Sequence, residues 1–187
     1  MGPSGADQPD SGAAAVSLPK LFLDCDGVLA DFDAGVRALL GMDAKAFEAR
    51  HGKGAFWKQL ARAGNFYATL PKMADADLLF DAVRHLRPTI LTGLPMGNWA
   101  APQKLAWAAE HFPGVPIITC MARDKFRHMS GADVLVDDSE RHMAAWVEAG
   151  GIYILHRSAR ESIAALDRKS TRLNSSHTDI SRMPSSA

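Results

Sequence analysis

Short apolar runs along the chain alternate with longer segments in which apolar residues recur at helical spacing. The first run, Leu21–Leu23, ends in two aspartates and a glycine, and it predicts a buried strand that stops at a turn. Further runs of this kind predict strands at residues 88–93, 116–120, 133–138 and 152–155. The helical spacing between them predicts helices at residues 74–86, 99–112 and 139–149.

Strands that alternate with helices in this way predict an α/β fold with an open, mostly parallel, Rossmann-like sheet and helices on both faces. Such sheets bind their ligands outside the carboxyl ends of the strands. Five polar side chains are expected at those ends: Asp24, Asp26, Thr92, Asp137 and Asp138. The sequence therefore predicts one cleft that gathers these side chains.

Three segments depart from the alternation of strands and helices. Residues 33–75 keep a helical pattern with a break near residues 51–54, which predicts a small helical cap inserted after the first strand. Residues 1–17 are rich in Gly, Pro, Ser and Ala and predict a disordered lead-in. Residues 168–187 have no apolar period and many serines, which indicates an artefactual or disordered tail. The main domain then spans residues 18–167.

Composition narrows the class of protein. The 187 residues suit one domain with a small insertion, and Lys+Arg and Asp+Glu are balanced at 21 each, which argues against a nucleic acid polymer or an anionic membrane as partner. Cys25 and Cys120 form no metal-binding pattern and are expected to be reduced thiols in a cytoplasmic protein. The chain shows neither a membrane-spanning apolar stretch nor the pattern of a signal peptide. A homodimer is left open.

The paired aspartates carry the chemical prediction. Asp24 and Asp26 point to the same side of the chain, and two carboxylates that close repel each other unless a cation offsets their charge. Mg²⁺ suits such oxygen ligands. Asp137 and Asp138 are neighbours and point to opposite sides of their strand, so we expect Asp138 on the metal and Asp137 orienting a basic group or a metal-bound water. The reversed assignment stays open.

Four segments of the chain resemble the four motifs of the haloacid dehalogenase (HAD) superfamily. They are Asp24-Cys25-Asp26-Gly27-Val28, Leu91-Thr92-Gly93, Lys104 and Val136-Asp137-Asp138. A narrower similarity, to the 5′(3′)-deoxyribonucleotidases, lies in Leu29–Phe32, Asn65–Tyr67 with Leu70-Pro71, Lys104–Trp107 and Ala122–Lys125. This resemblance covers roughly residues 20–157 and implies a HAD-type fold, a helical cap and the Mg²⁺-dependent removal of phosphate from nucleoside monophosphates.

The resemblance also implies roles for individual residues. Asp24 would be the nucleophile that forms an aspartyl-phosphate, and Asp26 would be the general acid and base and would lend its backbone carbonyl to the metal. Thr92 and Gly93 would bind the phosphate. Lys104 lies early in a predicted helix, where the helix dipole disfavours a cation, and we expect it to neutralise the phosphate and the nucleophile. Lys125 is the alternative lysine.

The substrate end of the site is expected to involve the cap. Phe32, Trp57 and Tyr67 would line a pocket that stacks a flat group, and Arg123 and Lys125 would contact the substrate or close the site. One departure from the deoxyribonucleotidases lies here too, because Gly93 stands where those enzymes usually carry serine.

The sequence thus predicts a Mg²⁺-dependent phosphomonoesterase that acts through an aspartyl-phosphate, most readily on (deoxy)nucleoside monophosphates. One alternative is a HAD phosphatase for another small phosphoester, since a fold does not fix its substrate. The other is a non-catalytic, phosphate-binding regulatory module.

Overall fold

One parallel sheet forms the centre of the fold. The computed structural model describes residues 19–178, with the backbone alone from residue 170 onward, and its strands have the order β3-β2-β1-β4-β5. They are β1 (Leu21–Leu23), β2 (Thr89–Leu94), β3 (Ile117–Met121), β4 (Val134–Asp137) and β5 (Ile152–Leu155). All neighbouring strands in this sheet run parallel, which confirms the predicted α/β fold.

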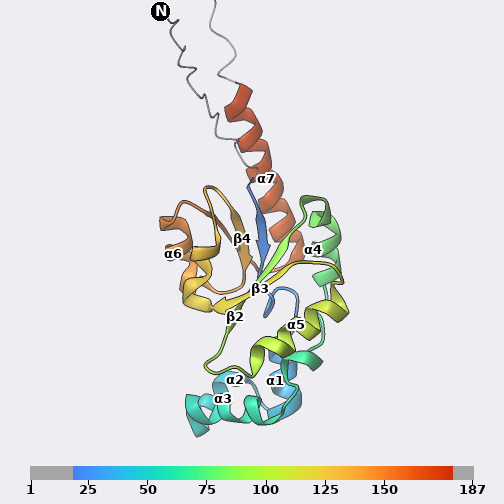
Figure 1. The fold of residues 1–187 in the computed structure, drawn as a ribbon, viewed down its shortest axis with the longest axis vertical. Coiled ribbons are helices and arrows are strands. Elements are labelled where there is room, and N and C mark those ends of the chain that lie inside the picture. Colours follow the sequence, from blue (N-terminus) through green and yellow to red (C-terminus); the bar gives the residue numbers. More distant parts are fainter. Residues whose placement is uncertain (1–18, 179–187) are drawn as a thin grey trace, which may run out of the picture.

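Helices cover both faces of the sheet and one of its ends (Figure 1). The α-helices are α1 (Phe32–Leu40), α2 (Ala44–His51), α3 (Lys53–Arg62), α4 (Ala76–Val83), α5 (Ala100–His111), α6 (Met143–Glu148) and α7 (Ala159–Thr178). Short 3-10 turns are η1 (Tyr67–Thr69), η2 (Arg84–Leu86), η3 (Ala122–His128) and η4 (Glu140–His142). The helix predicted at residues 139–149 is therefore two elements, η4 and α6.

The strands bury alternate side chains on opposite faces. Leu21 and Leu23 of β1 join the larger core, which packs against α4, α5 and α7. Phe22, between them, joins a smaller cluster with Leu91, Leu135 and Trp146 beneath α6. Because both faces are covered, the strands are apolar at nearly every position, as the continuous runs in the sequence indicated.

The predicted strand at residues 133–138 is shorter in the structure because its first residue serves another purpose. The buried carboxylate of Asp133 accepts hydrogen bonds from the backbone N–H groups of Lys20 (2.7 Å) and Ser130 (2.9 Å). Asp133 thereby joins the loop before β4 to the segment that enters β1.

The cap consists of α1, α2, α3 and η1, grouped at one end of the sheet in Figure 1. Asp31 caps α1 by accepting a hydrogen bond from the Ala34 backbone, and Gly41 ends that helix in the left-handed region (φ 70°). Where the cap returns to the sheet, the Trp107 indole N–H donates to the Leu70 carbonyl at 2.8 Å. A buried side chain of α5 therefore fixes the return segment of the cap.

At the carboxyl end, the last helix continues past a boundary that the sequence predicted. α7 runs to Thr178, so it continues past residue 168, where the tail was expected to begin. The predicted lead-in at residues 1–17 and the tail beyond Thr178 lie outside the described residues. Within the described part of the chain, no helix has the length and apolar character needed to cross a membrane.

Replacing Trp107 by alanine should lower the free energy of unfolding by about 3–5 kcal/mol, because it removes a large buried side chain and leaves the Leu70 carbonyl without its donor. Urea denaturation measures this change. The control is Leu105→Ala on the same helix; Leu105 is 45% exposed, so its loss should cost no more than about 0.5 kcal/mol. Equal losses in the two variants would contradict the role given to Trp107.

Candidate active site

The turn after β1 fixes the positions of the first two aspartates. The Cys25 carbonyl accepts a hydrogen bond from the backbone N–H of Ala30 at 2.8 Å, and Gly27 adopts the left-handed conformation (φ 76°) that this tight reversal requires. Cys25 itself is buried in the core. The chain therefore turns away at once and leaves Asp24 and Asp26 at the carboxyl edge of the sheet.

Lys125 joins Asp24 to the acidic end of β4. Its ammonium group is buried and lies 2.9 Å from Asp24 Oδ2 and 2.6 Å from Asp137 Oδ2. Burial lowers the pKa of Lys125, but the charges of Asp24 and Asp137 outweigh burial, and the net pKa is raised. Lys125 is therefore a buried cation held between two carboxylates. Of the two lysines that the sequence left open, Lys125 is the one in contact with Asp24.

Asp24, Asp137 and Asp138 form an acidic group in which one oxygen of each lies within 4.8 Å of the others. Burial raises the pKa of Asp24 to about 7 against the opposing effect of Lys125, and the charge of Asp137 raises it further. Burial followed by the charge of Asp137 raises the pKa of Asp138 to about 6. These shifts indicate that the ionised carboxylates need more positive charge than Lys125 provides.

A divalent cation fits this acidic group. Its donors are carboxylate oxygens, which hard cations prefer, and Asp138 is exposed toward the cavity while Asp24 and Asp137 are buried. Asp26 was expected to reach the metal through its backbone carbonyl, and its carboxylate lies outside the group of described side chains that gathers around this point.

Asp26 is instead paired with Lys104. The Lys104 ammonium group lies 2.5 Å from Asp26 Oδ2, donates to the Thr92 hydroxyl at 2.8 Å and sits 4.3 Å from the centre of the Tyr67 ring. Lys104 and Thr92 are buried beneath the cavity and do not line it. Lys104 thus contacts the second aspartate and Lys125 the first, and the effect expected of Lys104 on the nucleophile reaches Asp24 only through its charge, which lowers the Asp24 pKa.

Two glycines bring backbone close to the site. A Cβ atom on Gly27 would lie 2.2 Å from Asp138 Oδ2, so the Asp138 carboxylate rests directly against the Gly27 backbone. A Cβ atom on Gly93 would lie 2.8 Å from the Ala122 Cβ atom. The end of β2 therefore packs against the start of η3 too closely for a serine at position 93, which explains the departure noted in the sequence.

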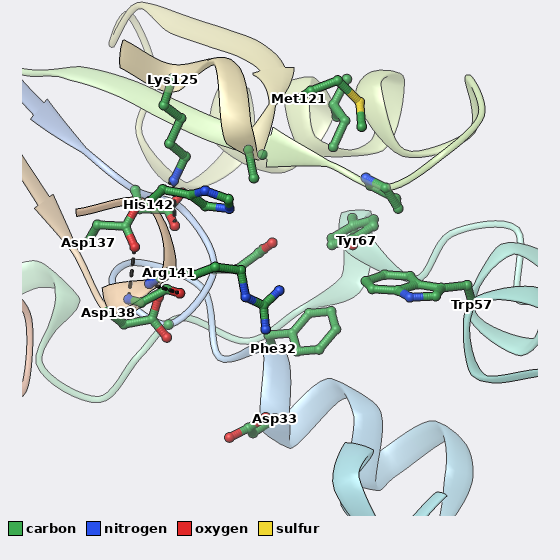
Figure 2. A pocket seen from close by; sticks show the side chains of 18 of the residues that line it. Phe32, Asp33, Trp57, Tyr67, Met121, Lys125, Asp137, Asp138, Arg141 and His142 are labelled. Carbon is green, nitrogen blue, oxygen red and sulfur yellow. Dashed lines mark hydrogen bonds and ion pairs between the residues drawn. The ribbon is translucent and has the colours of Figure 1, made fainter. Parts of the chain in front are cut away.

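A cavity of about 1070 Å³ opens above the acidic group. Phe32, Trp57 and Tyr67 lie on its wall, as do Gly93 and Lys125 (Figure 2). The three aromatic rings lie near one another, with 6.4 Å between the ring centres of Phe32 and Trp57 and 6.1 Å between those of Phe32 and Tyr67. Arg123 does not line the cavity; its side chain is 77% exposed and lies near Asp124.

Other residues of the cavity wall were not identified from the sequence. They are Lys53 from the start of α3, Arg141 and His142 from η4, and the methionines Met73, Met96 and Met121. Burial, together with the positive charges of Lys125 and Arg141, lowers the pKa of His142. These residues lie in turns or at element ends, where no periodic pattern marks them. For Arg141 and His142, the one available signal was that they follow Asp137 and Asp138 closely along the chain.

Comparison with known proteins identifies the family of the chain. Residues 41–168 match the model of the family described as 5′ nucleotidase, deoxy (pyrimidine), cytosolic type C protein (NT5C). The match covers more than half of the chain. The protein belongs to this family.

This 5′-nucleotidase family member was also compared with solved structures and with curated proteins. A hydrolase from Streptococcus pneumoniae TIGR4 matches with a TM-score of 0.50 and 15% sequence identity, over 79% of this chain and 97% of that chain. At this identity the likeness shows the fold alone. A comparison with curated proteins found no match.

Family membership makes the protein a 5′-nucleotidase-like hydrolase of the HAD superfamily with a small-molecule phosphoester as substrate. HAD-like phosphatases generally use a divalent metal ion, and the acidic group of Asp24, Asp137 and Asp138 has the donors for one.

Metal binding should depend on pH through Asp24 and Asp138, whose pKa values are raised to about 7 and about 6. Without metal, a raised carboxyl pKa favours the folded state at low pH, and this contribution falls as the pH rises through about 4 to about 7. A cation needs both groups ionised, so saturating Mg²⁺ should raise the Tm by at least about 5 °C near pH 8 and by about 1 °C or less near pH 5.

Thermal unfolding with Mg²⁺ and with EDTA at the two pH values measures this difference. Asp138→Asn is the control, because it removes one of the titrating ligands and should reduce the response near pH 8. An equal Tm increase at both pH values would show that these carboxylates do not control metal binding.

Proposed function

We propose that the protein is a Mg²⁺-dependent phosphomonoesterase that dephosphorylates (deoxy)nucleoside monophosphates through an aspartyl-phosphate on Asp24. One observation carries the proposal: the Asp24 carboxylate lies at the cavity floor in contact with the buried Lys125, within reach of Asp137 and Asp138 and beside a second aspartate, Asp26, with a lysine of its own. A nucleophile, a source of positive charge and an acid are therefore adjacent.

Asp24 is oriented for attack by its own surroundings. Its Oδ1 accepts a hydrogen bond from the Cys25 N–H at 2.7 Å, and its Oδ2 lies on Lys125. In the first step a carboxylate oxygen forms a bond to phosphorus while the bond from phosphorus to the leaving oxygen breaks. Lys125 offsets the negative charge that would otherwise keep a phosphate dianion away from a carboxylate.

Asp26 supplies the proton for the leaving alcohol and then accepts one from the water that hydrolyses the aspartyl-phosphate. Its Oδ2 is held by Lys104, while its Oδ1 is buried without a hydrogen-bond partner. A buried carboxylate oxygen with no partner suits a group that is to hold a proton or meet the leaving oxygen. We therefore assign Lys104 to the orientation of Asp26, and Lys125 to the phosphate and the nucleophile.

Asp24, Asp137 and Asp138 would hold the metal, with the backbone carbonyl of Asp26 as a further ligand. Mg²⁺ would supply positive charge to the phosphate oxygens and to the carboxylates. Asp137 also accepts hydrogen bonds from Lys125 and from the Ser139 backbone N–H, at 2.6 and 2.9 Å, so it orients the lysine as well as offering a ligand atom. Asp138 is the more exposed of the pair and faces the cavity.

The rest of the cavity suits a flat leaving group. Phe32, Trp57 and Tyr67 present an aromatic wall, and Met96 and Met121 add apolar, adaptable side chains to the lining. A volume of about 1070 Å³ exceeds the need of a phosphate alone. Phosphate binding would rest on Lys125 and on the backbone at Gly93. The free thiols Cys25 and Cys120 support a cytoplasmic location for this reaction.

The protein should release inorganic phosphate from dUMP or dTMP with Mg²⁺ and cease to do so in EDTA. Asp24→Asn should lower kcat by at least about 1000-fold, because the amide cannot attack phosphorus. A phosphate-release assay measures both effects. Asp77→Asn is the matched control, since Asp77 pairs with Lys72 on the surface, and it should retain full activity.

Near-normal turnover by Asp24→Asn would contradict the covalent mechanism. Faster hydrolysis of sugar phosphates or phosphoserine than of nucleotides would favour the alternative small-phosphoester phosphatase, and no hydrolysis of any of them would favour a non-catalytic phosphate-binding module.

Substrates with different leaving groups should distinguish the roles of Lys104 and Lys125. Lys125→Met should reduce hydrolysis of dUMP and of p-nitrophenyl phosphate by similar factors, because both need positive charge at the phosphate. Lys104→Met should reduce dUMP hydrolysis about 100-fold and p-nitrophenyl phosphate hydrolysis by about tenfold or less, because p-nitrophenolate leaves without a proton from Asp26.

Steady-state kinetics on both substrates, with circular dichroism to verify folding, tests this assignment. If Lys104→Met slows both substrates equally, Lys104 serves the phosphate, as the sequence first suggested.

A further inference from the structure

The turn that carries Asp137 and Asp138 is held at Ser139 from two directions. The Ser139 N–H donates to Asp137 Oδ1 at 2.9 Å, and the Ser139 carbonyl accepts a hydrogen bond from the Tyr153 hydroxyl at 2.5 Å. The first bond closes the turn on itself. The second ties it to a different strand, so the position of the turn depends on a side chain that the proposed mechanism does not use.

Tyr153 is well placed to act as a fixed point. It lies on β5, opposite Leu135 of β4, and its ring packs against the small core cluster that contains Phe22 and Trp146. Tyr153 does not line the cavity above the acidic group, so it has no direct access to the substrate.

The turn needs such support because the carboxylates of Asp137 and Asp138 repel each other and the carboxylate of Asp24. Asp24, Asp137 and Asp138 bring oxygens within 4.8 Å of one another, and Asp138 is the exposed member of the group. The Gly27 backbone lies directly against the Asp138 carboxylate and limits its movement on one side. A turn fixed before the ion arrives loses less conformational freedom when the ion binds than a turn that is free to move.

We propose that Tyr153 is a positioning residue for the divalent metal: through the Ser139 carbonyl it fixes the turn from Asp137 to Ser139 and keeps both aspartates in the geometry that the ion requires. The inference rests on the proposed function, which places a metal on these aspartates. Tyr153 acts on metal affinity and leaves the chemistry at Asp24 unchanged once the metal is bound.

Tyr153→Phe tests this role because it removes the hydroxyl and keeps the ring in its apolar cluster. The Mg²⁺ concentration that gives half-maximal activity should rise about tenfold, at the low end of the range for groups that support metal ligands, while kcat at saturating Mg²⁺ stays within about threefold of the wild type. Without substrate, calorimetric titration with Mg²⁺ should give a dissociation constant raised by the same factor.

Ser162→Ala is the matched control. Ser162 is buried, and its hydroxyl pairs with the His156 ring at 2.9 Å rather than with the acidic turn. It should lower the Tm by an amount comparable to that in Tyr153→Phe and leave Mg²⁺ affinity unchanged. A second variant, Tyr153→Met, also lacks the hydroxyl but keeps a flexible apolar side chain against the same cluster, and it should weaken Mg²⁺ binding in the same direction.

Unchanged Mg²⁺ affinity in Tyr153→Phe would overturn the inference, as would a large loss of kcat at saturating Mg²⁺ with normal affinity. If Tyr153→Phe does not fold, Tyr153→Met decides, and normal Mg²⁺ affinity in that variant overturns the inference. Failure of the proposed function is distinguishable, because the wild-type protein itself would then neither bind Mg²⁺ nor require it for phosphate release.

Discussion

The crowding of four carboxylates at one edge of the sheet is the constraint on which the site depends. Asp24, Asp26, Asp137 and Asp138 outnumber the two buried lysines by two negative charges. A buried charge is costly unless it is paired, so each lysine is stable where it lies because of its aspartates. The remaining excess of two negative charges equals the charge of one divalent cation, the kind of ion that HAD-like phosphatases generally use.

The lysines also separate the two aspartates of the first motif into different environments. Lys125 comes from the loop after β3 and meets Asp24 together with Asp137, whereas Lys104 comes from α5 and meets Asp26 together with Thr92. Two carboxylates two residues apart thus acquire different partners. In the proposed mechanism this separation lets one carboxylate act at phosphorus and the other at the leaving oxygen.

The sequence predicted two kinds of feature: the elements marked by the periodicity of apolar residues, and the site edge marked by acids directly after apolar strands. Apolar runs located every strand, and the acids that follow Leu23 and Val136 located the edge where the site forms. The partner of each lysine was not predictable, because spacing along the chain does not tell whether position 104 on α5 faces Asp24 or Asp26. The partner of Lys104 depends on where α5 lies relative to the strand ends. The packing of Trp107 and the cap determines that position. Arg141 and Lys53 were missed because turns and the first residues of helices carry no periodic signal.

One turn of α5 connects the cap to the proton-transfer group. Gln103 accepts a hydrogen bond from the Tyr67 backbone N–H at 2.9 Å, Trp99 stacks on the Tyr67 ring with 5.4 Å between ring centres, and Lys104 places its ammonium group against the same ring. The aromatic wall of the cavity and the orientation of Asp26 are therefore set by the same few residues. A displacement of Tyr67 would move Lys104, and through Lys104 it would move the carboxylate that must meet the leaving oxygen. In the proposed mechanism, substrate stacking and proton transfer therefore depend on the same residues of α5 and the cap.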